Sequence, residues 1–527
     1  MARNMTQDST GESAATMLVA LAKAEADLFH WGECCFATIS VSEHMETYAL
    51  RSRGFRSWLG KRFYEEHQRA ASGENLTSAI QTLEGIARYE GTERRVGVRI
   101  QSDCGKIYLD LANDDWQVVE ISADGWRIIE SRVCPVRFRR PHGMLALPKP
   151  EPGGKISHLR PFLNVSGDDG FVLTLGWLIG ALHPFGPYPL LIFHGEQGSA
   201  KTTSARLLRA LVDPNLAPVR SEPREPRDLM ISANNGWICA FDNLSNLPPW
   251  LSDALCRLST GGGFGTRALY TDDEEMIFEA KRPAILTGIE ELAVRGDLLD
   301  RALIVDLPRI PEEHYQSEEQ FWMKFENEKP RLLGALLTAV SAALANQSKV
   351  SLDRLPRMAD FAKWVSAAEP ALGWERGTFL RAYAANRKAA NELALETPVA
   401  EVIRKLALPW TGTASELLAN LETYVNDRTQ RSRSWPATPR QLSNTLRRLA
   451  PNLRQVGVFV EFGAREPGTG RRLITISDNE SISSSQASQS SREPQAQPTQ
   501  NPIDSERPGK SDERDDEIPS FRVEGEL

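Results

Sequence analysis

The sequence predicts an α/β fold with a mostly parallel sheet for the central part of the chain. An apolar strand at 188–194 runs into a glycine-containing loop, and a helix follows at 202–211. Three further apolar strands are expected at 237–241, 282–287 and 302–307, separated by helical or irregular segments. Strands that alternate with helices are typical of parallel sheets, because each crossover between parallel strands carries a helix.

The length and composition indicate a folded protein of several domains. A chain of 527 residues is too long for one core and predicts roughly three to four units. Hydrophobic residues make up 41% of it and charged residues 25%, which excludes global disorder. The longest apolar stretch, 171–182, is shorter than the roughly 20 residues that a membrane-spanning helix needs. The polar N-terminus carries no secretion signal, so a cytoplasmic protein without membrane contact is expected.

The predicted N-terminal domain, 13–146, combines helices with a small β-meander. Apolar residues recur every three or four positions between 13 and 85, which indicates helices throughout that stretch. From 96 to 139 the pattern changes to short alternating strands, with a hairpin turn at 124–125. Proline and glycine residues at 147–158 indicate a linker to the next domain.

Three segments follow the central α/β unit, which is placed at 159–312. Apolar residues at helical spacing predict a helical region at 313–406. The order helix, helix, strand, strand at 407–477 predicts a winged-helix domain. Few large apolar residues occur in the acidic segment 478–527, so a disordered tail is expected there, and residues 1–12 are expected to be disordered as well. The end of the tail is either a solvated terminus or a docking segment for a protein partner.

The loop between the central strand and helix has the composition of a phosphate-binding loop. It matches the pattern G-x-x-x-x-G-K-[ST] except at Ala200, which replaces a glycine. The backbone N–H groups of such a loop bind phosphates at a helix N-terminus. Lys201 is expected to neutralise the β- and γ-phosphates, and the Thr202 hydroxyl to bind Mg²⁺. Right-handed dihedral angles are expected at Ala200, where a methyl group would then fit without strain. The predicted nucleotide-binding residues are Gly195, Glu196, Gln197, Gly198, Ser199, Ala200, Lys201, Thr202 and Thr203.

An acidic residue at the end of the next strand is predicted to complete the metal site. Asp242 follows the apolar run 237–241 and is the candidate that holds the hydration shell of Mg²⁺. A turn aspartate at a strand end is the alternative. Asn243 stands where many such enzymes carry a second acid, which puts the rate of hydrolysis in question. Either Asn243 orients the attacking water, or a carboxylate such as Asp272 or Asp273 approaches it.

Two further positions are candidate catalytic residues. Thr287 ends a core strand with a hydroxyl suited to contact the γ-phosphate. Arg301 stands just before the strand at 302–307, from which an arginine can reach the nucleotide of a neighbouring subunit and stabilise transition-state charge. A structural ion pair with Asp300 is the alternative for Arg301, and Arg295 is a second candidate for the same role.

Two regions carry candidate contacts to nucleic acid. A glycine-rich stretch after residue 258 predicts a hairpin with an acidic tip, in which Arg267, Lys281 and Arg282 are placed to meet phosphates; a contact between subunits is the alternative. The predicted recognition helix of the C-terminal domain has a basic face, which favours DNA over a protein as its partner. The arginines of this face and of the wing are Arg440, Arg447, Arg448, Arg454, Arg465, Arg471 and Arg472.

The order of these motifs resembles that of the superfamily 3 helicases within the AAA+ P-loop ATPases. It is most similar to the helicase part of the primase-helicases of phages, plasmids and integrated elements, over about 159–310. The resemblance implies a homo-oligomeric ring, a hexamer, that binds ATP and Mg²⁺ between its subunits and moves along single-stranded DNA. By matching position, Lys201 and Thr202 would bind nucleotide and metal, Asp242 would be the Walker B acid, and Arg301 would be the arginine finger.

Three departures from the family pattern leave the activity open. Ala200 replaces a glycine, Asn243 replaces the second acid, and no asparagine ends the strand of Thr287. An ATP-driven DNA helicase or translocase is the first interpretation. A slow or non-hydrolysing, ATP-gated initiator or loader that binds single-stranded or duplex DNA is the second, and a regulatory ATPase that recruits proteins is the third.

Overall fold

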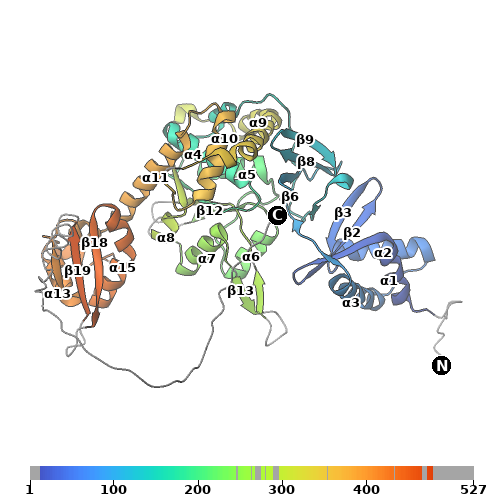
Figure 1. Ribbon diagram of the computed structural model, residues 1–527, viewed down its shortest axis with the longest axis horizontal. Coiled ribbons are helices and arrows are strands. Elements are labelled where there is room, and N and C mark those ends of the chain that lie inside the picture. Colours follow the sequence, from blue (N-terminus) through green and yellow to red (C-terminus); the bar gives the residue numbers. More distant parts are fainter. Residues whose placement is uncertain are drawn as a thin grey trace, which may run out of the picture.

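The computed structural model describes most of the chain. The described residues are 12–244, 247–262, 264–267, 275–278, 280–288, 296–352, 354–432, 434–465 and 472–478. The predicted disordered segments 1–12 and 478–527 lie almost entirely outside them. Three bodies follow one another from the N-terminus to the C-terminus, with the parallel sheet in the middle one (Figure 1).

The N-terminal body packs three helices against a sheet with the strand order β3-β2-β1-β4. Its elements are α1 (Ala14–Glu25), β1 (Ala26–Trp31), β2 (Cys34–Val41), β3 (His44–Ala49), α2 (Arg53–His67), α3 (Gly73–Tyr89) and β4 (Thr92–Glu93). The expectation of helices throughout 13–85 is therefore wrong for 26–49. Gly32 and Ser42 have φ angles of 51° and 52° in two tight turns, which reverse the chain into hairpins and cannot continue a right-handed helix.

A second sheet joins the N-terminal and central bodies. Its antiparallel strands are β6 (Ile100–Asp103), β7 (Lys106–Asp110), β8 (Gln117–Ser122) and β9 (Gly125–Glu130), and beside them β5 (Val96–Gly97) pairs with β10 (Arg137–Phe138). Five buried residues of this sheet share one hydrophobic core with the central helices: Ile100, Ile107, Leu109, Val119 and Ile121. The Leu147 N–H donates to the Leu111 carbonyl at 2.8 Å, and the Glu151 N–H donates to the Pro330 carbonyl at 3.0 Å. The core thus continues across the predicted linker at 147–158.

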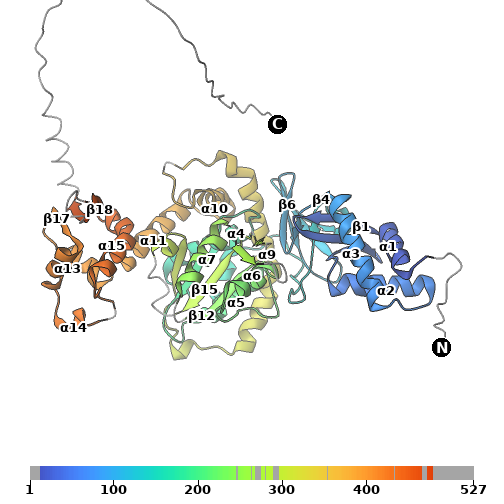
Figure 2. The same ribbon diagram turned by 90° about the horizontal axis from the view of Figure 1, so that it is seen from below.

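The central body is built on a four-stranded parallel sheet with the order β12-β15-β11-β16. This confirms the α/β class with a parallel sheet. Helices cover both sides of the sheet (Figure 2), so its two middle strands are almost wholly buried. The elements are α4 (Gly167–Ala181), β11 (Leu190–His194), α5 (Lys201–Val212), α6 (Pro226–Asn234), β12 (Cys239–Leu244), α7 (Pro249–Thr260), β13 (Phe264–Arg267), β14 (Glu275–Phe278), β15 (Ala284–Gly288), α8 (Gly296–Leu299), β16 (Ala302–Asp306), α9 (Glu318–Asn346), α10 (Ala359–Leu372) and α11 (Thr378–Ala394).

The C-terminal body has its own hydrophobic core and a three-stranded antiparallel sheet with the order β17-β19-β18. Its elements are α12 (Pro398–Ile403), β17 (Trp410–Thr413), α13 (Ala414–Glu422), α14 (Asp427–Gln430), α15 (Pro439–Gln455), β18 (Val458–Arg465) and β19 (Arg472–Asp478). Besides the predicted helices and strands, β17 pairs with β19 as a third strand. Helix α11 leads into this body (Figure 1), and Asn452 Nδ2 on α15 donates to Asn391 Oδ1 on α11 at 2.8 Å.

A buried carboxylate, Asp213, lies at the end of α5 between two buried arginines. Arg99 Nε donates to Asp213 Oδ1 at 3.2 Å, and Arg209 lies 3.8 Å from Asp213 Oδ2. Asp213 Oδ2 also accepts the N–H groups of Trp237 and Ile238, at 2.8 and 3.1 Å, just before β12. All three charged side chains are at most 2% exposed. One side chain therefore connects the start of β6, α5 and β12.

Replacing Asp213 by Asn is expected to lower the free energy of unfolding by about 3–5 kcal/mol, because two buried guanidinium groups would lose their counter-charge. Urea-induced unfolding measures the change. Asp115→Asn is the control, since the Asp115 side chain is 59% exposed and pairs with Lys149 at 2.8 Å; its cost should stay below about 1 kcal/mol. Equal shifts for the two variants would contradict this account of Asp213.

Helix α4 contains the longest apolar stretch of the sequence and lies inside the core, with every residue from 170 to 181 buried. Among the described residues, no helix is long and apolar enough to cross a membrane. His183 follows α4 and packs against Trp364, with 4.4 Å between the ring centroids and 53° between the ring planes. Burial lowers the pKa of His183 from 6.5 to about 4, against a smaller opposing effect of Asp360.

Stability should therefore depend on pH through His183. Between pH 6.5 and about 4 the unfolded chain binds a proton that the folded chain does not bind. The contribution of the neutral ring is thus full above pH 6.5 and falls by about 1.4 kcal/mol per pH unit below it. The free energy of unfolding should fall between pH 7 and pH 5 by about 2 kcal/mol less in His183→Gln than in wild type. Urea unfolding at the two pH values measures this difference. His142→Gln, at an exposed histidine, is the control and should follow wild type.

Candidate nucleotide-binding site

The candidate site lies at the carboxyl edge of the parallel sheet. Strand β11, which leads into the predicted phosphate-binding loop, lies between β15 and β16. The strands that follow β11 in the sequence thus lie on both sides of it, with β12 and β15 on one side and β16 on the other. Ligands of open α/β sheets bind where the strand order reverses in this way. The same edge carries Asp242 at the end of β12 and Thr287 near the end of β15.

Two glycines of the loop are required by its conformation. Gly195 has a φ of 152°, and a Cβ there would lie 2.3 Å from the Leu307 carbonyl oxygen. Gly198 has a φ of 84°, and its carbonyl accepts the Ile310 N–H at 3.2 Å. Inside the loop the Ser199 hydroxyl donates to the Glu196 carbonyl at 2.9 Å. The loop is thus packed closely against the segment that follows β16.

Ala200 is left-handed, with φ 62° and ψ 30°, and is the N-cap of α5. The expectation of right-handed dihedral angles at this position is therefore wrong. A change of hand between the loop and the helix turns successive backbone N–H groups toward one side, which is the geometry that binds anions. An L-residue in this conformation costs about 1–2 kcal/mol, which explains why the pattern has glycine here.

Lys201 begins α5 and lies against the loop. Its ammonium donates to the carbonyls of Gly195 and Glu196, at 2.6 and 2.7 Å. Burial lowers the pKa of Lys201, and the negative charge of Asp242 acts in the opposite direction. The positive charge is therefore held at the mouth of the loop, where phosphate oxygens can replace the carbonyls as its partners.

Thr202 and Asp242 meet across the site although they are 40 residues apart. The Thr202 hydroxyl lies 2.9 and 3.0 Å from the two carboxylate oxygens of Asp242. A hydroxyl and a carboxylate are hard oxygen donors, and Mg²⁺ is commonly held by one or two such groups together with phosphates and water. These two residues therefore fit Mg²⁺ and are the ones that would hold it beside the phosphate-binding loop.

Thr287 lies behind Asp242 and is only 1% exposed. Its hydroxyl donates to Asp242 Oδ1 and accepts the Asn243 N–H at 3.0 Å. This contact orients the carboxylate, and the predicted contact of Thr287 with a γ-phosphate stays a prediction. Asn243 has a φ of 55° at an irregularity of β12, and its side chain is exposed. Asp272 and Asp273, the predicted substitutes for a second acid, lie outside the described residues.

Arg301 lies between α8 and β16 and is partly buried. Its carbonyl accepts the Leu190 N–H at the start of β11, at 2.8 Å. The neighbouring Asp300 pairs with Arg357 at 2.6 Å and with Arg387 of α11. Asp300, which was the alternative partner predicted for Arg301, thus forms ion pairs with two other arginines. Arg295, the second candidate for the catalytic role, lies outside the described residues.

The predicted hairpin is present as β13 and β14, with Arg267 opposite Glu275. Lys281 is exposed after it. Arg282 is not available for phosphates, because its Nε donates to backbone carbonyls of the central body and its guanidinium lies 5.1 Å from the Trp237 ring centroid. The prediction that Arg282 contacts phosphates is therefore wrong, because its side chain turns inward onto the central body.

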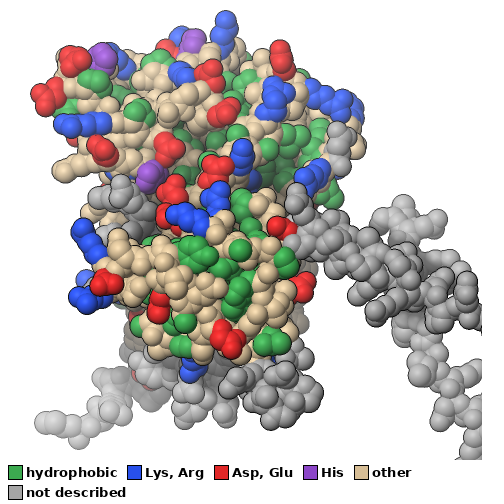
Figure 3. Space-filling model, turned by 90° about the vertical axis from the view of Figure 1, so that its left-hand side faces the viewer, with side chains coloured by type: hydrophobic (Ala, Val, Ile, Leu, Met, Phe, Trp, Pro, Cys, Tyr) green, Lys and Arg blue, Asp and Glu red, His purple; other side chains and the backbone are tan. Residues whose placement is uncertain are grey.

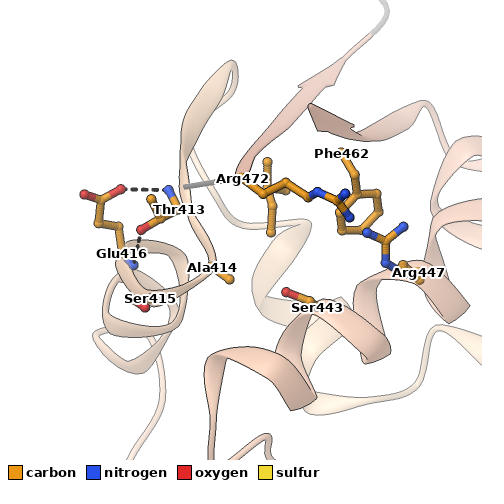
Figure 4. Close-up of a pocket in the computed structure, with 9 residues that line it drawn as sticks. Thr413, Ala414, Ser415, Glu416, Ser443, Arg447, Phe462 and Arg472 are labelled. Carbon is orange, nitrogen blue, oxygen red and sulfur yellow. Dashed lines mark hydrogen bonds between the residues drawn. The ribbon is translucent and has the colours of Figure 1, made fainter. Parts of the chain in front are cut away.

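The arginines Arg440, Arg447 and Arg448 lie on α15, and all three are exposed. The guanidinium of Arg447 lies 3.9 Å from the Phe462 ring centroid. It lines a pocket of about 540 Å³ between α13, α15 and β19, which Arg472 also lines (Figure 4). Basic and acidic side chains are interspersed on this side of the molecule (Figure 3), and Arg471 lies outside the described residues.

Comparison with protein families gives two adjacent matches. Residues 156–393 match the replication protein of actinomycete integrative conjugative elements, and residues 399–493 match the C-terminal domain of the same protein, AICE RepA. These two ranges of the chain are thus similar to the two parts of that replication protein. This confirms the predicted kind of protein, a replication protein of an integrated element. The first match contains the phosphate-binding loop, Asp242 and Arg301, and the second contains α13 and α15.

Several solved structures are similar to this chain. The apo C-terminal region of NrS-1 has 12% identity and a TM-score of 0.38, over 89% of this chain and 100% of that one. The active helicase Cch of SCCmec type IV has 12% identity and a TM-score of 0.40, over 85% and 91%. JCV helicase has 14% identity and a TM-score of 0.22, over 40% and 67%. Comparison with curated proteins gave no match.

The left-handed Ala200 leads to a prediction about stability. Ala200→Gly is expected to raise the free energy of unfolding by up to about 1 kcal/mol, because glycine removes the cost of the left-handed conformation and only part of this gain is offset by the greater freedom of the unfolded chain. Urea unfolding measures it. Ala210→Gly, in the same helix, is the control and should destabilise by about 1 kcal/mol. A loss of stability in both variants would contradict the strain at Ala200.

Proposed function

We propose that this chain is an ATP-hydrolysing DNA helicase or translocase that acts in the replication of a mobile element. The observation that carries the proposal is the contact of Thr202 with Asp242, 2.9 Å apart, beside Lys201. A loop of backbone amides, a lysine, and a hydroxyl–carboxylate pair for Mg²⁺ are the parts that P-loop enzymes use to bind a nucleoside triphosphate. Thr287 would hold Asp242 in the orientation that the metal requires.

The C-terminal body is proposed to be a winged helix that binds DNA. The topology of α13, α15 and the antiparallel strands β18 and β19 supports this, with α15 as the recognition helix. The exposed arginines of α15 support binding to a phosphate backbone. Leu442, Leu446 and Leu449 bury the opposite face of the helix, so the basic face remains exposed.

The proposal includes assembly into a ring, with Arg301 reaching the nucleotide of the next subunit. The resemblance to hexameric helicases supports it, as does the position of Arg301 just before the edge strand β16. Arg267 and Lys281 of the hairpin would then face single-stranded DNA. The hairpin lies between α7 and β15 in the chain, and β15 carries Thr287 of the candidate site.

A second candidate function rests on Asn243. Without a second acid the chain would bind ATP and hydrolyse it slowly, and the nucleotide would then gate assembly on DNA rather than drive movement. The exposed side chain of Asn243 follows Asp242 directly, so an amide stands where a carboxylate would polarise the attacking water.

ATP hydrolysis by the full chain, with and without single-stranded DNA, tests the two functions. We expect turnover that rises with DNA and is lost on removal of Mg²⁺ by a chelator. Lys201→Ala and Asp242→Asn should each lower kcat by roughly 100-fold or more, because each removes a group that stabilises charge on the phosphates or the metal. Lys149→Ala, at an exposed lysine outside the site, is the control.

The outcomes separate the candidates. ATP binding without turnover under either condition would refute the translocase and support the ATP-gated protein. Turnover that survives Lys201→Ala would refute both, because the phosphate-binding loop would then have no part in the reaction.

A further inference from the structure

The segment around Arg220 extends the parallel sheet beyond β12. The Arg220 N–H donates to the Ala240 carbonyl at 2.9 Å, and the Arg220 carbonyl accepts the Asp242 N–H at 2.8 Å. The two bonds form a parallel bridge in which Arg220 lies opposite Phe241. The chain therefore runs beside the end of β12, in the same direction, toward the edge of the sheet that carries Asp242.

Glu222 follows this bridge by two residues, just as Asn243 follows Phe241. Side chains two residues apart on a strand point to the same face, and neighbouring strands lie about 4.8 Å apart. The shared face is the one toward α6, because Arg220 bonds to α6 and Phe241 shares a core with residues of that helix. Glu222 is thus placed at the level of Asn243, where β12 becomes irregular and a second acid is missing.

The backbone on both sides of Glu222 is held against α6. Before it, Arg220 Nη1 donates to the Ser232 hydroxyl at 3.0 Å, and this hydroxyl donates to the Asp228 carbonyl at 2.9 Å. After it, the Arg224 N–H donates to Asp228 Oδ2 at 3.2 Å. These bonds fix the position of Glu222 relative to β12, which a group that acts on a bound water requires.

The carboxylate of Glu222 is available for chemistry, whereas that of Asp242 is engaged. Glu222 is partly buried, and no hydrogen bond or ion pair joins its side chain to any other residue that the structure describes. Asp242 is bonded to the hydroxyls of Thr202 and Thr287. A carboxylate without a partner can accept a proton, while one held as Asp242 is suits a metal ion.

We propose that Glu222 is the general base of ATP hydrolysis and takes the role that a second acid at position 243 would have. Its carboxylate accepts a proton from the attacking water while the water oxygen forms a bond to the γ-phosphorus. The bond between that phosphorus and the β–γ bridging oxygen breaks, so ADP and phosphate leave and the proton on Glu222 passes to solvent. The assignment rests on the proposed function, because ATP must first bind to the loop.

The test replaces Glu222 by Gln in the full chain, which keeps the shape of the side chain and removes the proton acceptor. The kcat for ATP hydrolysis with Mg²⁺ and single-stranded DNA should fall roughly 100-fold or more, as expected for the loss of a general base. The Kd for ATP, measured by calorimetry, should stay unchanged, because Glu222 contacts the water rather than the nucleotide. Glu225→Gln is the matched control, since Glu225 is exposed on the same segment and makes no side-chain bond to the start of α6. It should change neither quantity.

A second variant tests whether the two residues serve one position. Adding Asn243→Glu to Glu222→Gln returns a carboxylate to the neighbouring strand at the same level, and kcat should rise about tenfold or more above that of Glu222→Gln. A residue that only supports the backbone near α6 would give no such recovery. A double variant that binds ATP like wild type and stays as slow as Glu222→Gln would overturn the proposal.

The remaining outcomes separate this proposal from the proposed function. Unchanged kcat in Glu222→Gln would overturn the role of Glu222 alone. A loss of ATP binding as large as the loss of turnover would do the same, because the residue would then support the site rather than the chemistry. Wild type that binds ATP without turnover would also overturn it and leave the ATP-gated function. Wild type that binds no ATP would refute the proposed function itself, and the role of Glu222 with it.

Discussion

The geometry of the candidate site depends on the buried carboxylate of Asp213. This side chain binds the N–H groups just before β12 and pairs with Arg99 and Arg209, so it fixes the far end of α5 against the strand that carries Asp242. Thr202 at the first turn of α5 then meets Asp242 within hydrogen-bonding distance. Because α5 and β12 are joined by buried charges at one end, their other ends keep fixed positions relative to each other. A site for a metal and phosphates requires such fixed positions.

Local strain and local support occur together around the loop. Ala200 adopts a left-handed conformation, which is unfavourable in free energy for an L-residue. It keeps this conformation because residues outside the loop hold the loop in place. Asn164 and Ile310 bond to loop carbonyls, and Gly195 packs on the Leu307 carbonyl. The segment after β16 therefore supports the loop as much as the loop's own residues do.

The parts of the fold and site that sequence predicted are the local ones. The loop, the apolar strands and Asp242 carry their signal in consecutive residues, so their type and order could be inferred. Asp213 and Arg99 are 114 residues apart, and no local pattern joins them. The strands at 26–49 were missed because spacing alone does not reveal the two turns with positive φ. The bond of Thr287 to Asp242 could not be inferred from sequence, because the neighbour that a buried hydroxyl bonds to is decided by packing across strands.

Helix α11 connects the parallel sheet of the central body to the C-terminal body by contacts on both. Asn386 covers the open edge of β16, where its amide accepts the Ile304 N–H at 3.1 Å and donates to the Ile304 carbonyl at 2.5 Å. Arg387 pairs with Asp300 beside Arg301, and Asn391 bonds with α15 one turn later. An exposed strand edge invites pairing with another chain, and the asparagine occupies the N–H and the carbonyl of Ile304 on this edge. The same helix therefore positions α15 relative to β16, so the basic face of α15 and the strand that follows Arg301 are held in one orientation by a single element.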